Sequence, residues 1–185
     1  MVLHFKKTDL SGEEIQNLTG KPPILYSDLG KFTNINAVLG KEGFQVVLLQ
    51  TSSKTTGHWV ALTRNDITGK IRYNDSYGYN LPEERQYTAY DKALPMYITN
   101  LLANTDYEHN TVDYQAKKSG ISTCGRFASL FCKFRNLSLA QIKEMYTMNQ
   151  DTFFKDVDNT VTLLTLTALD DITSYLSSLP RGGNF

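Results

Sequence analysis

The spacing of the hydrophobic residues changes twice along this 185-residue chain, and this change constrains the fold more than any other feature. Up to about residue 40 the apolar residues recur at helical intervals. Compact apolar runs with β-branched members follow at residues 44–49, 58–64 and 70–75, and these predict strands. Helical spacing then returns. The order of helices, a small sheet and further helices predicts an α+β domain with a mostly antiparallel central sheet flanked by helices.

The remaining elements follow from capping residues, turn residues and spacing. Turn residues at 65–69 separate the second and third predicted strands, which should pair in antiparallel fashion. Helices are predicted near residues 11–19, 28–39, 93–103, 124–135, 138–146, 151–157 and 159–179, and an edge strand at 111–115. We expect a single catalytic domain over residues 1–179 and a flexible tail over 180–185.

Charge and cysteine content limit the partners and the compartment. Lysine plus arginine equals aspartate plus glutamate, 19 each, so net charge draws the chain neither to nucleic acid nor to an anionic membrane. No run approaches 18 consecutive apolar residues, so no membrane span is expected. On one helix Cys124 and Cys132 would lie eight residues, about 12 Å, apart, which is too far for a disulfide. Free thiols are typical of a reducing, intracellular compartment.

Cys124 stands where a loop is expected to turn into a helix, and it is the candidate nucleophile. The N-terminus of a helix carries unpaired N–H groups and a partial positive charge, which stabilise a thiolate. The next residue, Gly125, is expected to leave space for a substrate carbonyl. The alternative for Cys124 is a buried structural cysteine. That structural role is the expected one for Cys132, which lies within an apolar helix.

His58 is the candidate general base, because it opens a predicted strand and its imidazole suits proton transfer at neutral pH. If this strand forms a hairpin with the next, His58 would lie next to Asn74 and Asp75. Asp75 could accept the Nδ1 proton of the ring and orient it, and Asn74 could do the same. The alternatives are a half-exposed structural histidine and turn residues that simply end a strand.

An acyl transfer also needs hydrogen-bond donors for the developing oxyanion. The backbone N–H of Cys124 is one candidate. The side chain of Gln115, on the segment that leads to the nucleophile, is the second. A thiol, a base, an acid and these donors together predict a cysteine-dependent hydrolase, with no metal or other cofactor.

The motifs, taken in order, resemble the adenovirus-type and SUMO-deconjugating cysteine protease superfamily, and most of all its viral branch in adenoviruses, virophages, Polinton-like elements and large DNA viruses. The residues that carry the resemblance are His58-Trp59, Asp75-Ser76-Tyr77-Gly78, Gln115 and Cys124-Gly125, within about residues 24–135. The resemblance implies a papain-like core in circularly rearranged order, with Cys124 as nucleophile, His58 as base, Asp75 as orienting acid and Gln115 as oxyanion donor.

Three further residues are predicted to line the substrate site: Gly57, Trp59 and Gly125. A core tryptophan is the alternative for Trp59. One departure from the family concerns the eight residues between Gln115 and Cys124, a longer gap than usual. Either this loop is extended, or another group serves as the donor.

The viral relatives mature capsid precursors, often near Gly-Gly sequences. The resemblance therefore implies a cysteine endopeptidase that acts on viral structural precursors, in the virion or in the cytoplasm or nucleus of the host cell. The alternatives are a protease that deconjugates ubiquitin-like proteins, an acyltransferase on the same triad, and a non-catalytic protein. The peptide and DNA activators of the adenoviral enzyme are not supported here, because Cys132 lies beyond the nucleophile and the charge is balanced. Gly182-Gly183 in the tail is a candidate self-cleavage site.

Overall fold

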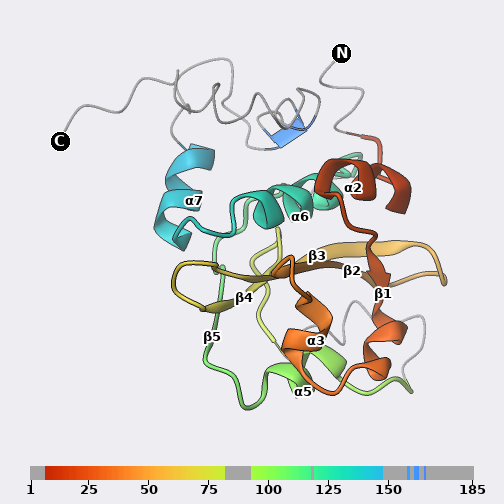
Figure 1. The fold of residues 1–185 in the computed structure, drawn as a ribbon. Coiled ribbons are helices and arrows are strands. Elements are labelled where there is room, and N and C mark those ends of the chain that lie inside the picture. The colour runs from red at the N-terminus through yellow and green to blue at the C-terminus, as the bar shows by residue number, and fades with distance from the viewer. Residues whose placement is uncertain are drawn as a thin grey trace, which may run out of the picture.

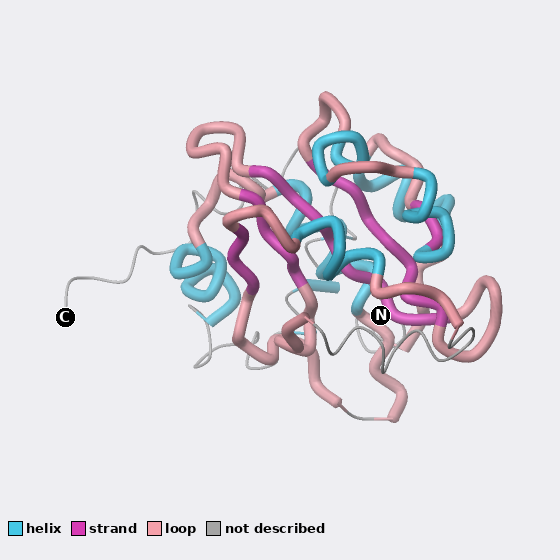
Figure 2. Tube along the Cα trace, turned by 90° about the horizontal axis from the view of Figure 1, so that it is seen from below, coloured by secondary structure: helices cyan, strands magenta, loops and turns pink. Residues whose placement is uncertain are grey.

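Helices cover both faces of one five-stranded sheet in the computed structural model of this protein (Figure 1). The structure describes residues 7–81, 93–117 and 119–147, together with residues 158, 161, 162 and 165. The strands, in their order across the sheet, are β1 (Ile24–Leu25), β2 (Phe44–Gln50), β3 (Gly57–Arg64), β4 (Ile71–Asn74) and β5 (Tyr107–His109). Seen from below, they run across the middle of the described part of the chain, with loops at their ends (Figure 2).

The sheet is mixed, which corrects the expectation of a mostly antiparallel one. The β2–β3 and β3–β4 pairs are antiparallel, as predicted, but β1–β2 and β4–β5 are parallel. The central strands follow one another through loops, whereas each parallel pair is joined by a longer connection that contains helix. The α+β class is confirmed.

The upper layer consists of α2 (Gly12–Thr19), α6 (Cys124–Lys133) and α7 (Leu139–Thr147) (Figure 1). Ser11 and Glu14 form the predicted capping box, in which each side chain accepts a hydrogen bond from the backbone N–H of the other residue. Every residue of α6 up to Cys132 is buried, because this helix lies between the sheet and α2. The helices predicted at residues 11–19, 124–135 and 138–146 are confirmed with small shifts at their ends.

The lower layer consists of the 3-10 helix η1 (Tyr26–Lys31), α3 (Ile35–Leu39) and α5 (Tyr97–Leu102) (Figure 1). The single helix predicted at residues 28–39 is wrong. The backbone is extended at Phe32, and the Asn34 side chain accepts a hydrogen bond from Ala37 N–H, so a new helix begins there. The helix predicted at 93–103 is shorter, because it starts only at Tyr97.

The edge strand predicted at residues 111–115 is also wrong, since the strand at this edge is β5. The backbone N–H groups of Tyr114 and Gln115 both donate to the carbonyl of Ser76, at 2.9 and 3.0 Å. This segment therefore bonds to the turn that follows β4 and not to a strand. That pairing carries Gln115 toward the candidate site.

The C-terminal predictions fall largely on residues that the structure does not describe. The helix predicted at 151–157 and the tail at 180–185, with its Gly182-Gly183 sequence, lie outside the described residues. The described residues Val161, Thr162 and Thr165, within the helix predicted at 159–179, are helical, as is Asp158 just before it. Among the described helices, none has the length and apolar composition needed to cross a bilayer.

Candidate active site

Cys124 is the first residue of α6, as predicted, and only 7% of its surface is exposed. The helix begins here because the backbone N–H groups of Arg126 and Phe127 both bond to the carbonyl of Thr123, at 2.9 and 3.0 Å. No residue that the structure describes accepts a hydrogen bond from the N–H of Cys124 or of Gly125. Two N–H donors at the start of the helix are therefore not used by the described part of the protein.

His58 lies between Asp75 and Cys124, and both His58 and Asp75 are buried. The ring Nε2 lies 2.8 Å from the Oδ1 atom of Asp75. This corrects one atom of the expectation, which placed Nδ1 on the carboxylate. Cys124 also lies close enough to the ring to raise the pKa of His58. The structure thus brings together the thiol, the imidazole and the carboxylate that the sequence motifs single out.

Asp75, and not Asn74, orients the ring, which resolves the choice left open by the sequence. Asn74 is paired with Ala61 in the β3–β4 register, and its amide nitrogen donates to Ala61 O and Thr63 Oγ1 at 3.2 and 3.1 Å. Asp75 lies just beyond the strand, where its backbone N–H donates to the Oδ1 atom of Asn110 at 2.8 Å. The Asn110 amide donates back to the Asp75 carbonyl, so the backbone that carries the carboxylate is fixed on both sides.

The protonation of His58 reflects its two neighbours. Burial lowers the pKa of the ring. The negative charge and hydrogen bond of Asp75, with a contribution from Cys124, raise the pKa by more than burial lowers it, so the pKa of His58 is about 10. Below that pH the folded protein carries an imidazolium between two acceptors.

Tyr77 is a site residue that the analysis of single residues missed, although it lies in the Asp75-Ser76-Tyr77-Gly78 motif. Its ring stacks on His58 with the centroids 4.7 Å apart, and its backbone N–H donates to Asp75 Oδ1 at 2.8 Å. Burial, together with the charges of Cys124 and Asp75, raises the pKa of Tyr77 to about 12, so the phenol keeps its proton at neutral pH.

Gln115 joins the same cluster through two hydrogen bonds. The Ser76 hydroxyl donates to Gln115 Oε1 at 2.7 Å, and Gln115 Nε2 donates to the Tyr77 hydroxyl at 3.1 Å. Through these bonds Gln115 is connected to Tyr77, whose ring stacks on His58.

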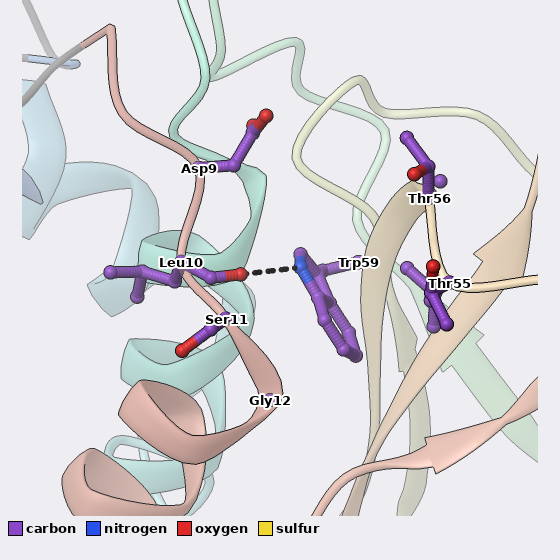
Figure 3. A pocket seen from close by; sticks show the side chains of 9 residues that line it. Asp9, Leu10, Ser11, Gly12, Thr55, Thr56 and Trp59 are labelled. Carbon is purple, nitrogen blue, oxygen red and sulfur yellow. Dashed lines mark hydrogen bonds between the residues drawn. The ribbon is translucent and has the colours of Figure 1, made fainter.

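Trp59 and Gly57, predicted to line the substrate site, line a pocket of about 440 Å³. The pocket lies between the segment that leads into α2 and the end of the β2–β3 hairpin, and the Trp59 indole donates to the carbonyl of Leu10 at 3.2 Å (Figure 3). Polar side chains of Asp9, Ser11, Thr55 and Thr56 surround an apolar wall of Trp59, Leu10 and Leu48.

Gly125 does not leave open space for a substrate carbonyl, which corrects that expectation. A Cβ atom at this position would lie 3.1 Å from Leu10 Cβ and 3.2 Å from Trp59 Cδ1. The glycine instead allows the start of α6 to pack closely against Trp59. Gly57 is more severely constrained, because its Cβ would lie 1.9 Å from the carbonyl oxygen of Leu49.

Cys132 has the structural role expected of it. Both cysteines are free, and burial raises the pKa of the Cys132 thiol well above its ordinary range. Among the described residues, no group of three His, Cys, Asp or Glu side chains is arranged to hold a metal ion.

Asn110 and Asp158 also take part in the arrangement and were missed by the sequence analysis. Neither residue belongs to a local motif. Asn110 bonds to Asp75 and Asp158 bonds to Thr123, and in each pair the two residues are 35 positions apart in the sequence. Single-sequence reasoning offers no signal for such contacts.

Comparison with known proteins places the chain near a virophage protein. It is 28% identical over 174 residues to the "Uncharacterized protein V9" of Sputnik virophage, and the match covers 88% of this chain and 97% of that protein. No protein-family model matches the chain. The similarity is that of a distant homologue and extends along nearly the whole of both proteins, which agrees with the viral relationship expected from the motifs.

Proposed function

We propose that this protein is a cysteine peptidase that hydrolyses peptide bonds in viral capsid or other structural precursor proteins. One observation carries the proposal: the buried His58 ring pairs with the Asp75 carboxylate and lies close to Cys124 at the first turn of α6. A thiol at the end of such a chain of polar groups is the nucleophile of acyl-transfer enzymes.

The proposed reaction has two halves. The Cys124 sulfur attacks the carbonyl carbon of the scissile bond, and the electron pair of the carbonyl double bond moves to oxygen. The C–N bond then breaks as His58 gives its proton to the leaving amine. In the second half, water gives a proton to His58 and attacks the thioester, and the C–S bond breaks to release the acid and the thiolate.

Each neighbouring group has a separate part in these steps. Asp75 holds the ring through Nε2 and stabilises the imidazolium, so Nδ1 is the nitrogen left to exchange a proton with the sulfur and the amine. The N–H groups of Cys124 and Gly125 and the Nε2 of Gln115 are the donors for the oxyanion.

Two comparisons support the proposed class of substrate. The similarity to a virophage protein favours a viral setting, and the resemblance of the motifs favours cleavage near glycine. The pocket beside Trp59 offers polar and apolar groups to a peptide chain. A deconjugating protease for ubiquitin-like proteins would use the same site, and the two functions differ only in the substrate that is cleaved.

Replacing the thiol tests the proposal. The Cys124→Ala variant should lose turnover entirely, because the other thiol, Cys132, is buried in the interior of α6, while the fold should be kept. The wild-type protein is incubated with virophage structural proteins and with ubiquitin-like conjugates, and new N-termini are sequenced. New termini in the structural proteins are expected; new termini in the conjugates alone would select the deconjugase.

Cys132→Ala provides the matched control, since it removes the second thiol from the interior of the same helix. This variant should keep its turnover. Its folding stability should fall by about 1 kcal/mol, because the substitution leaves a small cavity. Near-wild-type turnover in Cys124→Ala would refute the peptidase. Iodoacetamide at about pH 6 should alkylate Cys124 and leave Cys132 unmodified.

A further inference from the structure

A buried carboxylate joins the two ends of the loop between Gln115 and Cys124. Asp158 is 1% exposed. Its Oδ2 atom accepts a hydrogen bond from the backbone N–H of Ala116 at 2.9 Å, and its Oδ1 atom accepts one from the Thr123 hydroxyl. Ala116 directly follows Gln115, and Thr123 directly precedes Cys124. One side chain therefore holds the residues adjacent to both groups that the proposed reaction assigns to the oxyanion.

The Thr123 hydroxyl is diverted to Asp158 from its usual task. A threonine before a helix normally accepts a hydrogen bond from the backbone of the first turn. Thr123 makes no such bond, and its fully buried side chain donates to Asp158 instead. Hydrogen bonds to a carboxylate are stronger than those between neutral groups. A buried carboxylate that loses a donor also costs free energy, because its charge is left uncompensated. The two hydrogen bonds to Asp158 hold the backbone on both sides of the loop.

The helical turn that carries Asp158 is itself attached to α6. The Thr162 hydroxyl donates to the Asp158 carbonyl at 2.7 Å, and one turn further the Thr165 hydroxyl accepts a hydrogen bond from Arg126 Nη1 at 2.9 Å. Arg126 lies in the first turn of α6 and is 3% exposed. The negative charge of Asp158 also reaches Tyr77, whose hydroxyl accepts the Gln115 hydrogen bond.

We propose that Asp158 is a positioning residue for the oxyanion donors. Its carboxylate fixes Ala116 and Thr123, so the Gln115 side chain and the N–H groups at the start of α6 converge on the same oxygen. This inference rests on the proposed function and also explains how an eight-residue gap between Gln115 and Cys124 still presents both groups.

Two substitutions remove the link from opposite sides. Asp158→Asn keeps the shape of the side chain but loses one acceptor, and Thr123→Val keeps the shape but loses the hydroxyl. Each should lower kcat about tenfold to a hundredfold with KM changed less than about twofold, because misplaced donors act on the transition state. Thr123→Ser, which restores the hydroxyl, should recover most of the lost kcat. If Asp158→Asn does not fold, Thr123→Val and Thr123→Ser still test the link.

Two further readouts separate positioning from general destabilisation. Alkylation of Cys124 by iodoacetamide should stay within about threefold of the wild-type rate, because the nucleophile itself is unchanged, while hydrogen exchange at the Ala116 amide should become faster. Thr165→Val is the matched control, since it breaks the Arg126 contact of the same helical face and leaves Asp158 in place. It should keep kcat within about threefold.

Two outcomes would overturn the inference: a wild-type kcat in Asp158→Asn or Thr123→Val, or an equal loss in Thr165→Val. An inactive wild-type protein would count against the proposed function instead. In that case, an unchanged exchange rate at Ala116 in Asp158→Asn would show separately that the carboxylate does not hold the loop.

Discussion

At the scale of single residues, the site depends on how His58 is held. The ring pairs with a buried carboxylate on one side, stacks on Tyr77 and lies close to Cys124. A carboxylate that is itself fixed by Asn110 gives the ring one orientation. The resulting pKa of His58, about 10, has consequences for folding as well as for chemistry.

The first prediction concerns stability against pH. The pKa of His58 is about 10 in the folded state and near 6.5 in the unfolded state, so the folded protein binds the extra proton between these values. The stabilisation is complete below about pH 6.5 and is lost as the pH rises toward about 10. Asp75→Asn removes the charge that raises the pKa, and should flatten this dependence. Urea unfolding across this pH range measures both proteins.

Asp9→Asn is the control for this experiment, because Asp9 is exposed and does not contribute to the pKa shift of His58. Its stability should vary with pH as in the wild type. Identical slopes in Asp75→Asn and the wild type would show that the carboxylate does not set the protonation of His58.

At the scale of elements, the β2–β3 hairpin delivers His58 to the start of α6. Gly57 is opposite Gln50, and His58 is opposite Leu49 in the same register. The absence of a side chain at Gly57 lets the two backbones approach each other where the strand begins. The residue was predicted to bind substrate, and the geometry assigns it a packing function as well as a place in the pocket wall.

The second prediction is that Gly57→Ala destabilises the protein by about 1–3 kcal/mol or more. Its Cβ would meet backbone at 1.9 Å, which no side-chain rotation relieves. Gly12→Ala is the matched control, because its Cβ would make only an ordinary contact, 3.4 Å from Pro23 Cγ, and alanine favours the helix. Urea unfolding should separate the two variants; equal stabilities would contradict the close approach of the strands.

At the scale of the whole molecule, Arg72 connects parts that are distant in sequence. Its guanidinium is 3% exposed and donates to Glu108 Oε1 from Nε and Nη2, at 2.9 and 2.6 Å. Its Nη1 donates to the carbonyl of Leu137, between α6 and α7, at 3.1 Å. One side chain thus joins β4, the parallel edge strand β5 and the upper helical layer.

The third prediction is that Arg72→Ala lowers the free energy of unfolding by about 2–3 kcal/mol, because it leaves a carboxylate and a carbonyl without their donor. Lys70→Ala is the control, because Lys70 and its partner Asp106 directly precede β4 and β5. Its ion pair with Asp106 is much more exposed and should contribute less than about 1 kcal/mol. Thermal unfolding measures both; equal losses would mean that the buried pair stabilises no more than the exposed one.

The sequence by itself determined the features that depend on near neighbours. The capping box at Ser11, the central antiparallel strands and the helix that begins at Cys124 all follow from local spacing and capping. The candidates His58, Asp75 and Cys124 stand in recognisable local motifs, whereas Gln115 was singled out by its place before the nucleophile and by the family resemblance. The break between η1 and α3 was missed, since helical spacing continues across it while Asn34 starts a new helix.

Only the tertiary structure decided which groups meet. Asp75 orients the ring because the β3–β4 register turns Asn74 toward Ala61, and a shift of one residue would have reversed this. Gly125 packs on Trp59, and Asp158 reaches the nucleophile loop from 35 residues away. Contacts of this kind depend on register and loop closure, which local preferences do not encode, so the roles of Asn74, Gly125 and Asp158 were visible only once the chain was folded.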